Sequence, residues 1–94
     1  MNFLLNNQVE IISCDFQKDE NGNFFEVSES LGFFFAEVKE IRKKNKVSLN
    51  VVMRENQDIP ENFKIIFDWK EYSILSILEK EQGFISIACE RQKV

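Results

Sequence analysis

Few residues in this chain could carry out catalysis. Its 94 residues include no histidine, the side chain that most often transfers protons near neutral pH. Carboxylates are plentiful, but their spacing indicates exposed faces and turns rather than a catalytic pair. The scattered acidic residues are Glu10, Asp15, Asp19, Glu20, Glu26, Glu29, Glu37 and Glu40. Gly22, Gly32 and Gly83 are too far apart to form a phosphate-binding loop. We therefore expect a protein that is not an enzyme.

The two cysteines do not suggest a metal site. Cys14 and Cys89 each lie within an alternating apolar run, and neither has a histidine or a second cysteine at metal-ligand spacing. Small buried thiols are common in reduced cytosolic proteins. We expect both cysteines to be buried and reduced, and we expect no metal or cofactor.

A basic cluster lies between two apolar runs. Arg42, Lys43, Lys44 and Lys46 surround Asn45. Such a cluster could contact nucleic acid, with phenylalanines stacking on bases. The net charge is -4, however, and the isoelectric point is about 4.9, so a basic groove along a nucleic-acid backbone is not expected. The sequence favours a solvated turn whose charges oppose aggregation, with any contact to DNA confined to that turn.

Short β-rich runs separated by polar breaks dominate the chain and predict antiparallel strands. The runs cover residues 9–16, 24–28, 47–53, 63–67, 72–78 and 84–91. Between the first two runs, the Asn21-Gly22 step is typical of a hairpin turn. Residues 31–41 fit both a helix and a strand, because their apolar residues match both periods. The expected fold is mainly β, a small antiparallel β-barrel or sandwich with at most a short helix, in one domain of residues 1–94.

Two segments are expected to protrude as loops. One is the basic turn at residues 42–46, and the other precedes the C-terminal strands around Pro60, which lacks the amide proton of a strand interior. The residues predicted to contact partners are Arg42, Lys43, Lys44, Asn45, Lys46, Glu55, Asn56, Gln57, Asp58, Ile59 and Pro60.

Phenylalanine is abundant, with ten residues in the chain. Because large rings give a small protein much buried area, most of them are expected to fill the core. Phe3, Phe24 and Phe33 are the ones expected to be exposed. The first five residues lack the basic flank of a signal peptide, and no apolar run is long enough to span a membrane, so we expect synthesis in the cytoplasm and no membrane partner.

The order of these features resembles the head-to-tail joining proteins of tailed bacteriophages, also called head-closure or stopper proteins. The resemblance spans roughly residues 9–92 and depends on short motifs rather than on catalytic residues. These motifs are the polar turn at 19–23, Phe35-Ala36-Glu37-Val38, the strand at 49–54 that ends in Arg54, and the runs at 63–67, 71–77 and 85–91. Family members usually carry a longer insertion after the Ala-x-Val strand; here only residues 39–46 follow it. The same pattern occurs in prophages and gene transfer agents.

The resemblance implies a structural protein of the phage neck that is assembled in the host cytoplasm. Such a protein forms a ring of six or twelve copies, docks under the portal and adaptor, retains packaged DNA and provides the attachment platform for the tail. The implied partners are other copies of the chain, the portal and adaptor, and a tail terminator or tail completion protein, while DNA passes without specific binding. The alternatives are a tail terminator or minor tail component, a small β-barrel that binds nucleic acid or protein, and a small inhibitory or immunity protein.

Overall fold

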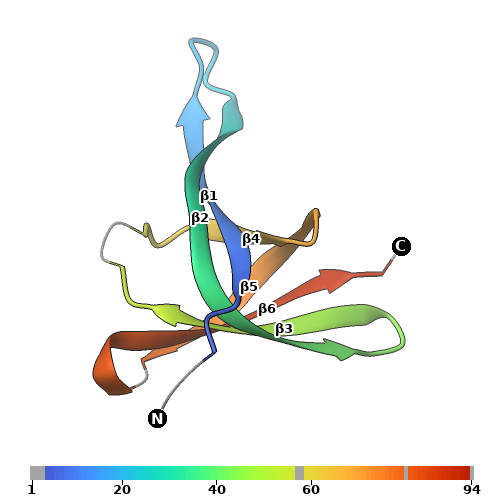
Figure 1. Ribbon diagram of the computed structural model, residues 1–94. Helices are drawn as coiled ribbons and strands as arrows, with labels where there is room; N and C mark the ends of the chain where they lie inside the picture. Colours follow the sequence, from blue (N-terminus) through green and yellow to red (C-terminus); the bar gives the residue numbers. More distant parts are fainter. Residues whose placement is uncertain (1–3, 57–58, 80, 94) are drawn as a thin grey trace.

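Six strands form a barrel in which every pair of neighbours is antiparallel (Figure 1). The structure is a computed structural model that describes residues 4–56, 59–79 and 81–93. The strands are β1 (Asn7–Lys18), β2 (Phe24–Arg42), β3 (Lys46–Arg54), β4 (Phe63–Phe67), β5 (Lys70–Glu79) and β6 (Phe84–Gln92), and a 3-10 turn, η1 (Glu81–Gly83), precedes β6. The order around the barrel is β1-β2-β3-β6-β5-β4, and β4 pairs with β1 to close it. The predicted all-strand fold is confirmed.

The core is built from alternate residues of the strands, because successive side chains of a strand point to opposite faces. On β3, Leu49 and Val51 lie opposite Cys89 and Ile87 of β6, and all four side chains are buried. The main buried cluster consists of Val9, Ile11, Ala36, Val47, Leu49, Val51, Met53, Phe63, Ile65, Tyr72, Ile85, Ile87 and Cys89. Its members come from all six strands, so the barrel interior is filled by side chains.

Residues 31–41, which fit both a helix and a strand in sequence, are part of β2, a single strand of 19 residues. A β-bulge allows the strand to continue where the sequence suggested a break. Ile11 of β1 pairs with Gly32, and the next residue, Ile12, pairs with Ser30, which leaves Leu31 as the extra residue of β2. Gly32 has a φ of 106°, a backbone conformation that glycine adopts without strain.

The hairpin of β1 and β2 extends beyond the barrel and forms a two-stranded arm (Figure 1). Strand β4 pairs only with residues Glu10 to Ser13 of β1, so residues 15–18 pair with β2 alone. We call residues 15–27 the arm. Its turn has the expected Asn-Gly step: Gly22 has a φ of 83°, and the Asp19 carboxylate accepts hydrogen bonds from the amides of Asn21 and Asn23 at 2.9 and 2.8 Å. The arm lengthens the molecule to 51 Å, against 34 and 20 Å in the other two directions.

In the described part of the chain, no helix is long or apolar enough to cross a membrane.

Candidate interaction surfaces

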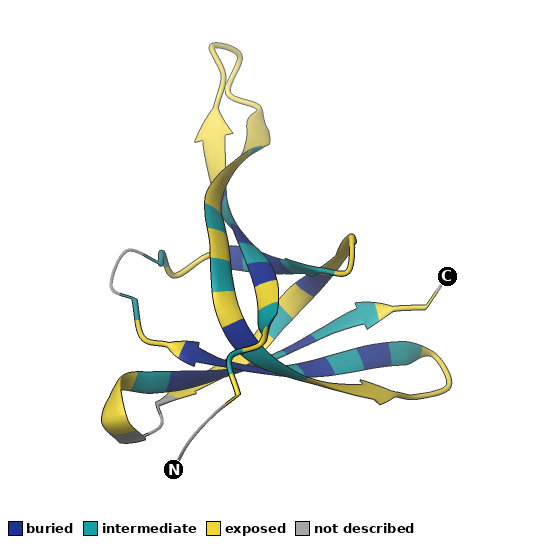
Figure 2. Ribbon diagram, viewed as in Figure 1, coloured by how far each residue is buried: buried dark blue, intermediate teal, exposed yellow. Residues whose placement is uncertain are grey.

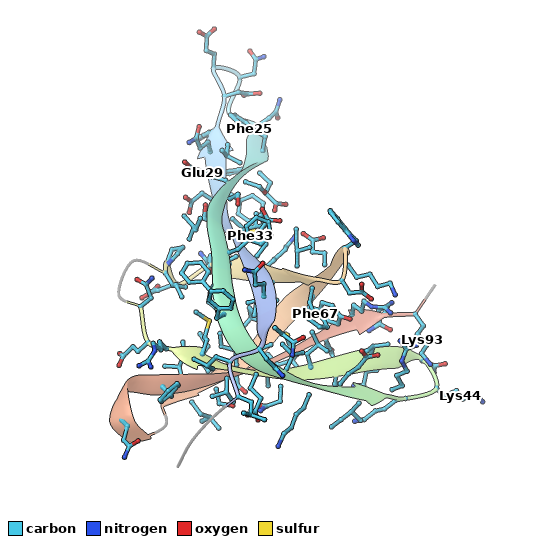
Figure 3. All side chains as sticks on the ribbon, in the orientation of Figure 1. Phe25, Glu29, Phe33, Lys44, Phe67 and Lys93 are labelled. Atoms are coloured by element: carbon cyan, nitrogen blue, oxygen red, sulfur yellow. The ribbon has the colours of Figure 1, made fainter. Side chains whose placement is uncertain are left out.

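The predicted basic turn joins β2 to β3 as a short hairpin connection. The Lys43 amide donates to the Lys46 carbonyl at 2.9 Å, and the Lys93 amide donates to the Asn45 carbonyl at 3.0 Å. Figure 3 shows Lys44 and Lys93 at this same end of the barrel. Arg42 pairs with Glu40 at 2.6 Å, and Lys46 pairs with Glu90 at 3.2 Å. Because two of the four cations are neutralised locally, the turn offers less positive charge than its sequence suggests.

The second predicted loop, between β3 and β4, is partly anchored to the barrel. The Glu55 amide donates to the Gly83 carbonyl at 2.7 Å, and Ile59 packs against the core, while Pro60 is half-buried. Asn56 lies beside a cavity that we describe below. Gln57 and Asp58 lie outside the described residues. Within the described residues, the exposed part of this loop is therefore short.

The two predicted loops do not form one site. The basic turn precedes Lys46, the first residue of β3, whereas the second loop follows Arg54, the last residue of the same strand. Figure 1 accordingly places them at opposite sides of the barrel. Any partners that they bind must approach from different directions.

The arm exposes three phenylalanine side chains, of which sequence analysis expected only Phe24 to be exposed. Phe16 is 71% exposed and Phe24 is 72% exposed, and Phe25 is also classed as exposed. Figure 2 shows the arm as exposed along nearly its whole length, and Figure 3 shows Phe25 on it, beyond the barrel. The expected exposure of Phe24 and Phe33 is confirmed, whereas the expectation that most phenylalanines fill the core is wrong. Among the described ones only Phe63 is buried, and Phe34 and Phe67 pack partly buried against the core. Phe3 lies outside the described residues.

A salt-bridge network fixes the base of the arm to the barrel. The Lys64 ammonium of β4 lies 3.5 Å from the Glu26 carboxylate on the arm and 3.4 Å from the Glu71 carboxylate on β5. These two carboxylates raise the pKa of Lys64. Since all three side chains are partly exposed, the network positions the arm more than it stabilises the fold.

An apolar cavity lies where the end of β3 meets the middle of β2. It has a volume of about 520 Å³ and is lined by Leu5, Phe33, Phe34, Phe35, Met53, Arg54, Glu55 and Asn56. Phe33 and Phe35 are exposed, because they point away from the barrel interior, whereas Met53 is buried. The cavity is thus a mainly apolar recess that opens to the surface, with one cation and one anion, Arg54 and Glu55, in its lining. Its size suits a single large side chain or a small ligand.

The turn between β4 and β5 presents the most exposed large apolar side chain of the described residues. Trp69 is 97% exposed. Asp68 and Trp69 form a two-residue hairpin turn between the paired residues Phe67 and Lys70, with φ values of 53° and 64°. Turns of this type favour glycine or asparagine, so a tryptophan here is both unpacked and conformationally unfavourable.

The buried thiols and the acidic residues do not form a metal site in the described part of the chain. Cys14 and Cys89 are both free and buried, as expected. Burial raises the pKa of Cys89 to about 12, so its thiol is neutral at physiological pH and is a poor nucleophile. Within residues 4–56, 59–79 and 81–93, no three acidic or cysteine side chains gather into a possible metal site.

Sequence analysis missed three surfaces: the apolar arm, the cavity beside Phe33 and the exposed Trp69. The Asn-Gly turn indicated a hairpin but gave no sign that it extends past the barrel. Sequence analysis assigned Trp69 to a break between two strands. A large apolar side chain in such a break was the available sign that it would be exposed. The cavity depends on how the end of β3 meets β2, which no local pattern reveals.

No protein-family model matches the chain, and no curated protein matches its sequence. Solved structures do share its fold. A chain from the virion of a native gene transfer agent particle matches with a TM-score of 0.77 and 15% sequence identity, over 95% of this chain and 96% of that one. Protein SF1141 from Shigella flexneri 2a matches with a TM-score of 0.72 and 18% identity, over 95% of each chain. At these identities the likeness shows a common fold: the chain has the same barrel architecture as a virion component.

Proposed function

We propose that this chain is a structural protein of a phage-like virion and that it forms a ring at the neck, between head and tail. The observation that carries the proposal is the fold match to a chain of a gene transfer agent virion over nearly the full length of both chains. The sequence resemblance to head-to-tail joining proteins is independent support, since it depends on local motifs rather than on the backbone.

The arm supports an assembly role on physical grounds. A two-stranded hairpin is only marginally stable in water by itself, and exposed phenylalanines on it lose the benefit of burial. Phe16, Phe24 and Phe25 nevertheless lie exposed on this arm, and the Lys18 ammonium lies 5.8 Å from the centroid of the Phe24 ring. Contact with another subunit or virion protein would bury these rings.

The proposed role is mechanical rather than catalytic. A ring of six or twelve copies docks under the portal and adaptor, retains packaged DNA and provides the platform for a tail terminator or tail completion protein. The net charge of -4 suits a channel through which DNA must pass without being held, because the subunit does not attract phosphate groups overall. In this proposal the protein resides in the virion neck after assembly in the host cytoplasm.

The positions of the two loops suggest how the neck partners divide between them. The basic turn at residues 42–46 and the loop at residues 55–60 lie at opposite ends of β3. We assign one of them to the channel or a neighbouring copy and the other to an adaptor or tail protein.

Electron microscopy of the chain mixed with purified portal and adaptor from its own particle tests this function. We expect a ring beneath the portal. A matched variant replaces residues 17–25 with Asn-Gly, which joins the paired residues Phe16 and Glu26 by a two-residue turn and keeps Glu26 near Lys64. This variant should keep the barrel but bind more weakly. Rings on isolated tails, with none on portals, would indicate a tail component and would overturn the neck assignment.

A further inference from the structure

Trp69 is a protruding side chain, and the cavity beside Phe33 is a recess on a distant part of the same molecule. The β4–β5 turn and the end of β3 are at opposite sides of the barrel (Figure 1). A protruding group on one side and a matching cavity on the other cannot meet within one subunit. They can meet between two copies, in a head-to-tail contact that generates a ring when the rotation closes.

The apolar match is a tryptophan against phenylalanines. Trp69 has almost no contact with its own chain, as its 97% exposure shows. The cavity of about 520 Å³ offers the exposed rings of Phe33 and Phe35 and the buried Met53. Aromatic and Met-aromatic contacts favour an indole in such a place, and tryptophan is one of the residues enriched at the energetic centres of protein interfaces.

The charges around the two features are complementary as well. Asp68 and Lys70 flank Trp69, while Arg54 and Glu55 line the cavity. Arg54 lies 5.1 Å from the Phe84 ring centroid. Among the residues that the structure describes, none of these four charged side chains has an ion-pair partner in its own chain. A second copy can supply both missing partners at once, Asp68 to Arg54 and Lys70 to Glu55.

We infer that Trp69 of one subunit inserts into the cavity between Phe33, Phe35 and Met53 of the next, with Asp68 facing Arg54. The inference deepens the proposed ring by naming its contact. It also accounts for a tryptophan in a turn that favours glycine: the residue is unfavourable in the free subunit and becomes buried in the assembled ring.

Replacing Trp69 by glycine separates folding from assembly. Glycine suits the left-handed backbone at this position, so Trp69→Gly should leave the melting temperature unchanged or raise it. Ring formation on portal and adaptor should fall at least tenfold. Phe33→Ser, which alters the cavity instead, should weaken assembly in the same way. Leu75→Ser is the matched control, because Leu75 is an exposed apolar residue outside both features, and it should leave assembly intact.

Charge reversal tests the pairing directly. Asp68→Arg and Arg54→Asp should each weaken assembly, and the double variant should restore it, because the two charges then attract again with their positions exchanged. Two single losses without recovery in the double variant would overturn the Asp68–Arg54 pairing.

Cross-linking tests proximity without relying on the neck partners. A chain with Lys70→Cys and Glu55→Cys, in a Cys14→Ser background, is treated with a short bis-maleimide at high protein concentration. Cys89 remains in this background but is fully buried. A head-to-tail contact gives a ladder of multimers, and each variant with only one of the two introduced cysteines should stay monomeric. Products that stop at dimers would indicate a symmetric contact and overturn the inference.

The two proposals fail in different ways. If wild-type rings form beneath the portal and Trp69→Gly rings form equally well, the Trp69 contact is wrong and the neck function stands. If the ladder forms but no ring appears on portals, the contact stands and the neck function is wrong.

Discussion

Arg91 of β6 donates a hydrogen bond from Nε to the hydroxyl oxygen of Tyr72 on β5 at 3.2 Å, and its guanidinium lies 5.7 Å from the centroid of the Tyr72 ring. Tyr72 is only 2% exposed. The arginine therefore satisfies the polar end of a buried aromatic residue while remaining half-buried itself. This contact links two neighbouring strands of the barrel through their side chains.

Removing the Tyr72 hydroxyl should cost little, and removing its ring should cost much. We expect Tyr72→Phe to lower the free energy of unfolding by about 1 kcal/mol, the usual net value of one hydrogen bond. Tyr72→Ala should lower it by ~3–5 kcal/mol, because it leaves a large cavity in the core. Urea denaturation followed by circular dichroism measures both. An alanine variant as stable as the phenylalanine variant would contradict the packing described here.

The raised pKa of Cys89 predicts a loss of stability in alkali. The pKa is about 12 in the folded protein, against an ordinary value of 9.0. The folded state therefore holds the proton of Cys89 more tightly than the unfolded state does. The contribution of this thiol to the free energy of unfolding is fully present below pH 9 and is lost as the pH rises towards 12. Between these pH values the free energy of unfolding falls by about 1.4 kcal/mol per pH unit.

Cys89→Ala provides the comparison for that slope. All other side chains are common to the two proteins, so the difference in unfolding free energy between pH 9 and 11 isolates the cysteine. Equal pH dependence in the two proteins would show that the Cys89 thiol is not desolvated.

Gly32 tests whether the bulge depends on glycine. Its φ of 106° is unfavourable for other L-residues, yet a Cβ there would meet no atom within 4 Å. Gly32→Ala should therefore lower the free energy of unfolding by ~1–3 kcal/mol through backbone strain alone. D-alanine, introduced by semisynthesis, matches the sign of this φ and should leave stability nearly unchanged. If L- and D-alanine are equally destabilising, crowding rather than backbone strain is the cause.

The basic turn should bind nucleic acid only weakly. Arg42 and Lys46 are paired with carboxylates, which leaves Lys43 and Lys44 as the main source of positive charge. We expect fluorescence anisotropy with a labelled oligonucleotide to give a Kd no tighter than roughly 10⁻⁴ M at physiological salt, the weak end of non-specific binding. Lys43→Glu with Lys44→Glu should abolish any residual binding at low salt. Tight binding with a steep salt dependence would instead support a nucleic-acid-binding barrel.

Most of the barrel could be predicted from the sequence, because its inner faces alternate regularly. The run from Val47 to Met53 and the last three strands lie where the sequence placed them. Alternating apolar residues marked most of these strands, and the polar breaks on both sides marked β5, whose own alternation is interrupted by a bulge between Ile74 and Ser76. Residues 31–41 could not be assigned to helix or strand, because three consecutive phenylalanines show no alternation of apolar and polar residues. The bulge at Leu31 also shifts the inward-facing positions of β2 by one residue.

The surfaces were harder to predict than the core for a physical reason. An apolar residue on a strand is buried only if another part of the protein packs against that face of the strand. Whether this happens depends on the whole fold and not on the local sequence. Phe16 and Val9 lie on the same predicted strand, yet Phe16 is exposed because β1 has already left the barrel at that point. The loops at residues 42–46 and 55–60 were located as connections, whereas their separation along β3 follows from the topology.

The arm also changes how this protein behaves in solution. The Cα radius of gyration is 14.5 Å, whereas a compact chain of this length is expected to have about 12.4 Å. An elongated particle experiences more friction than a sphere of equal mass, so it elutes early from a sizing column. A single subunit can therefore be mistaken for a small oligomer, and light scattering or sedimentation equilibrium is needed to weigh it.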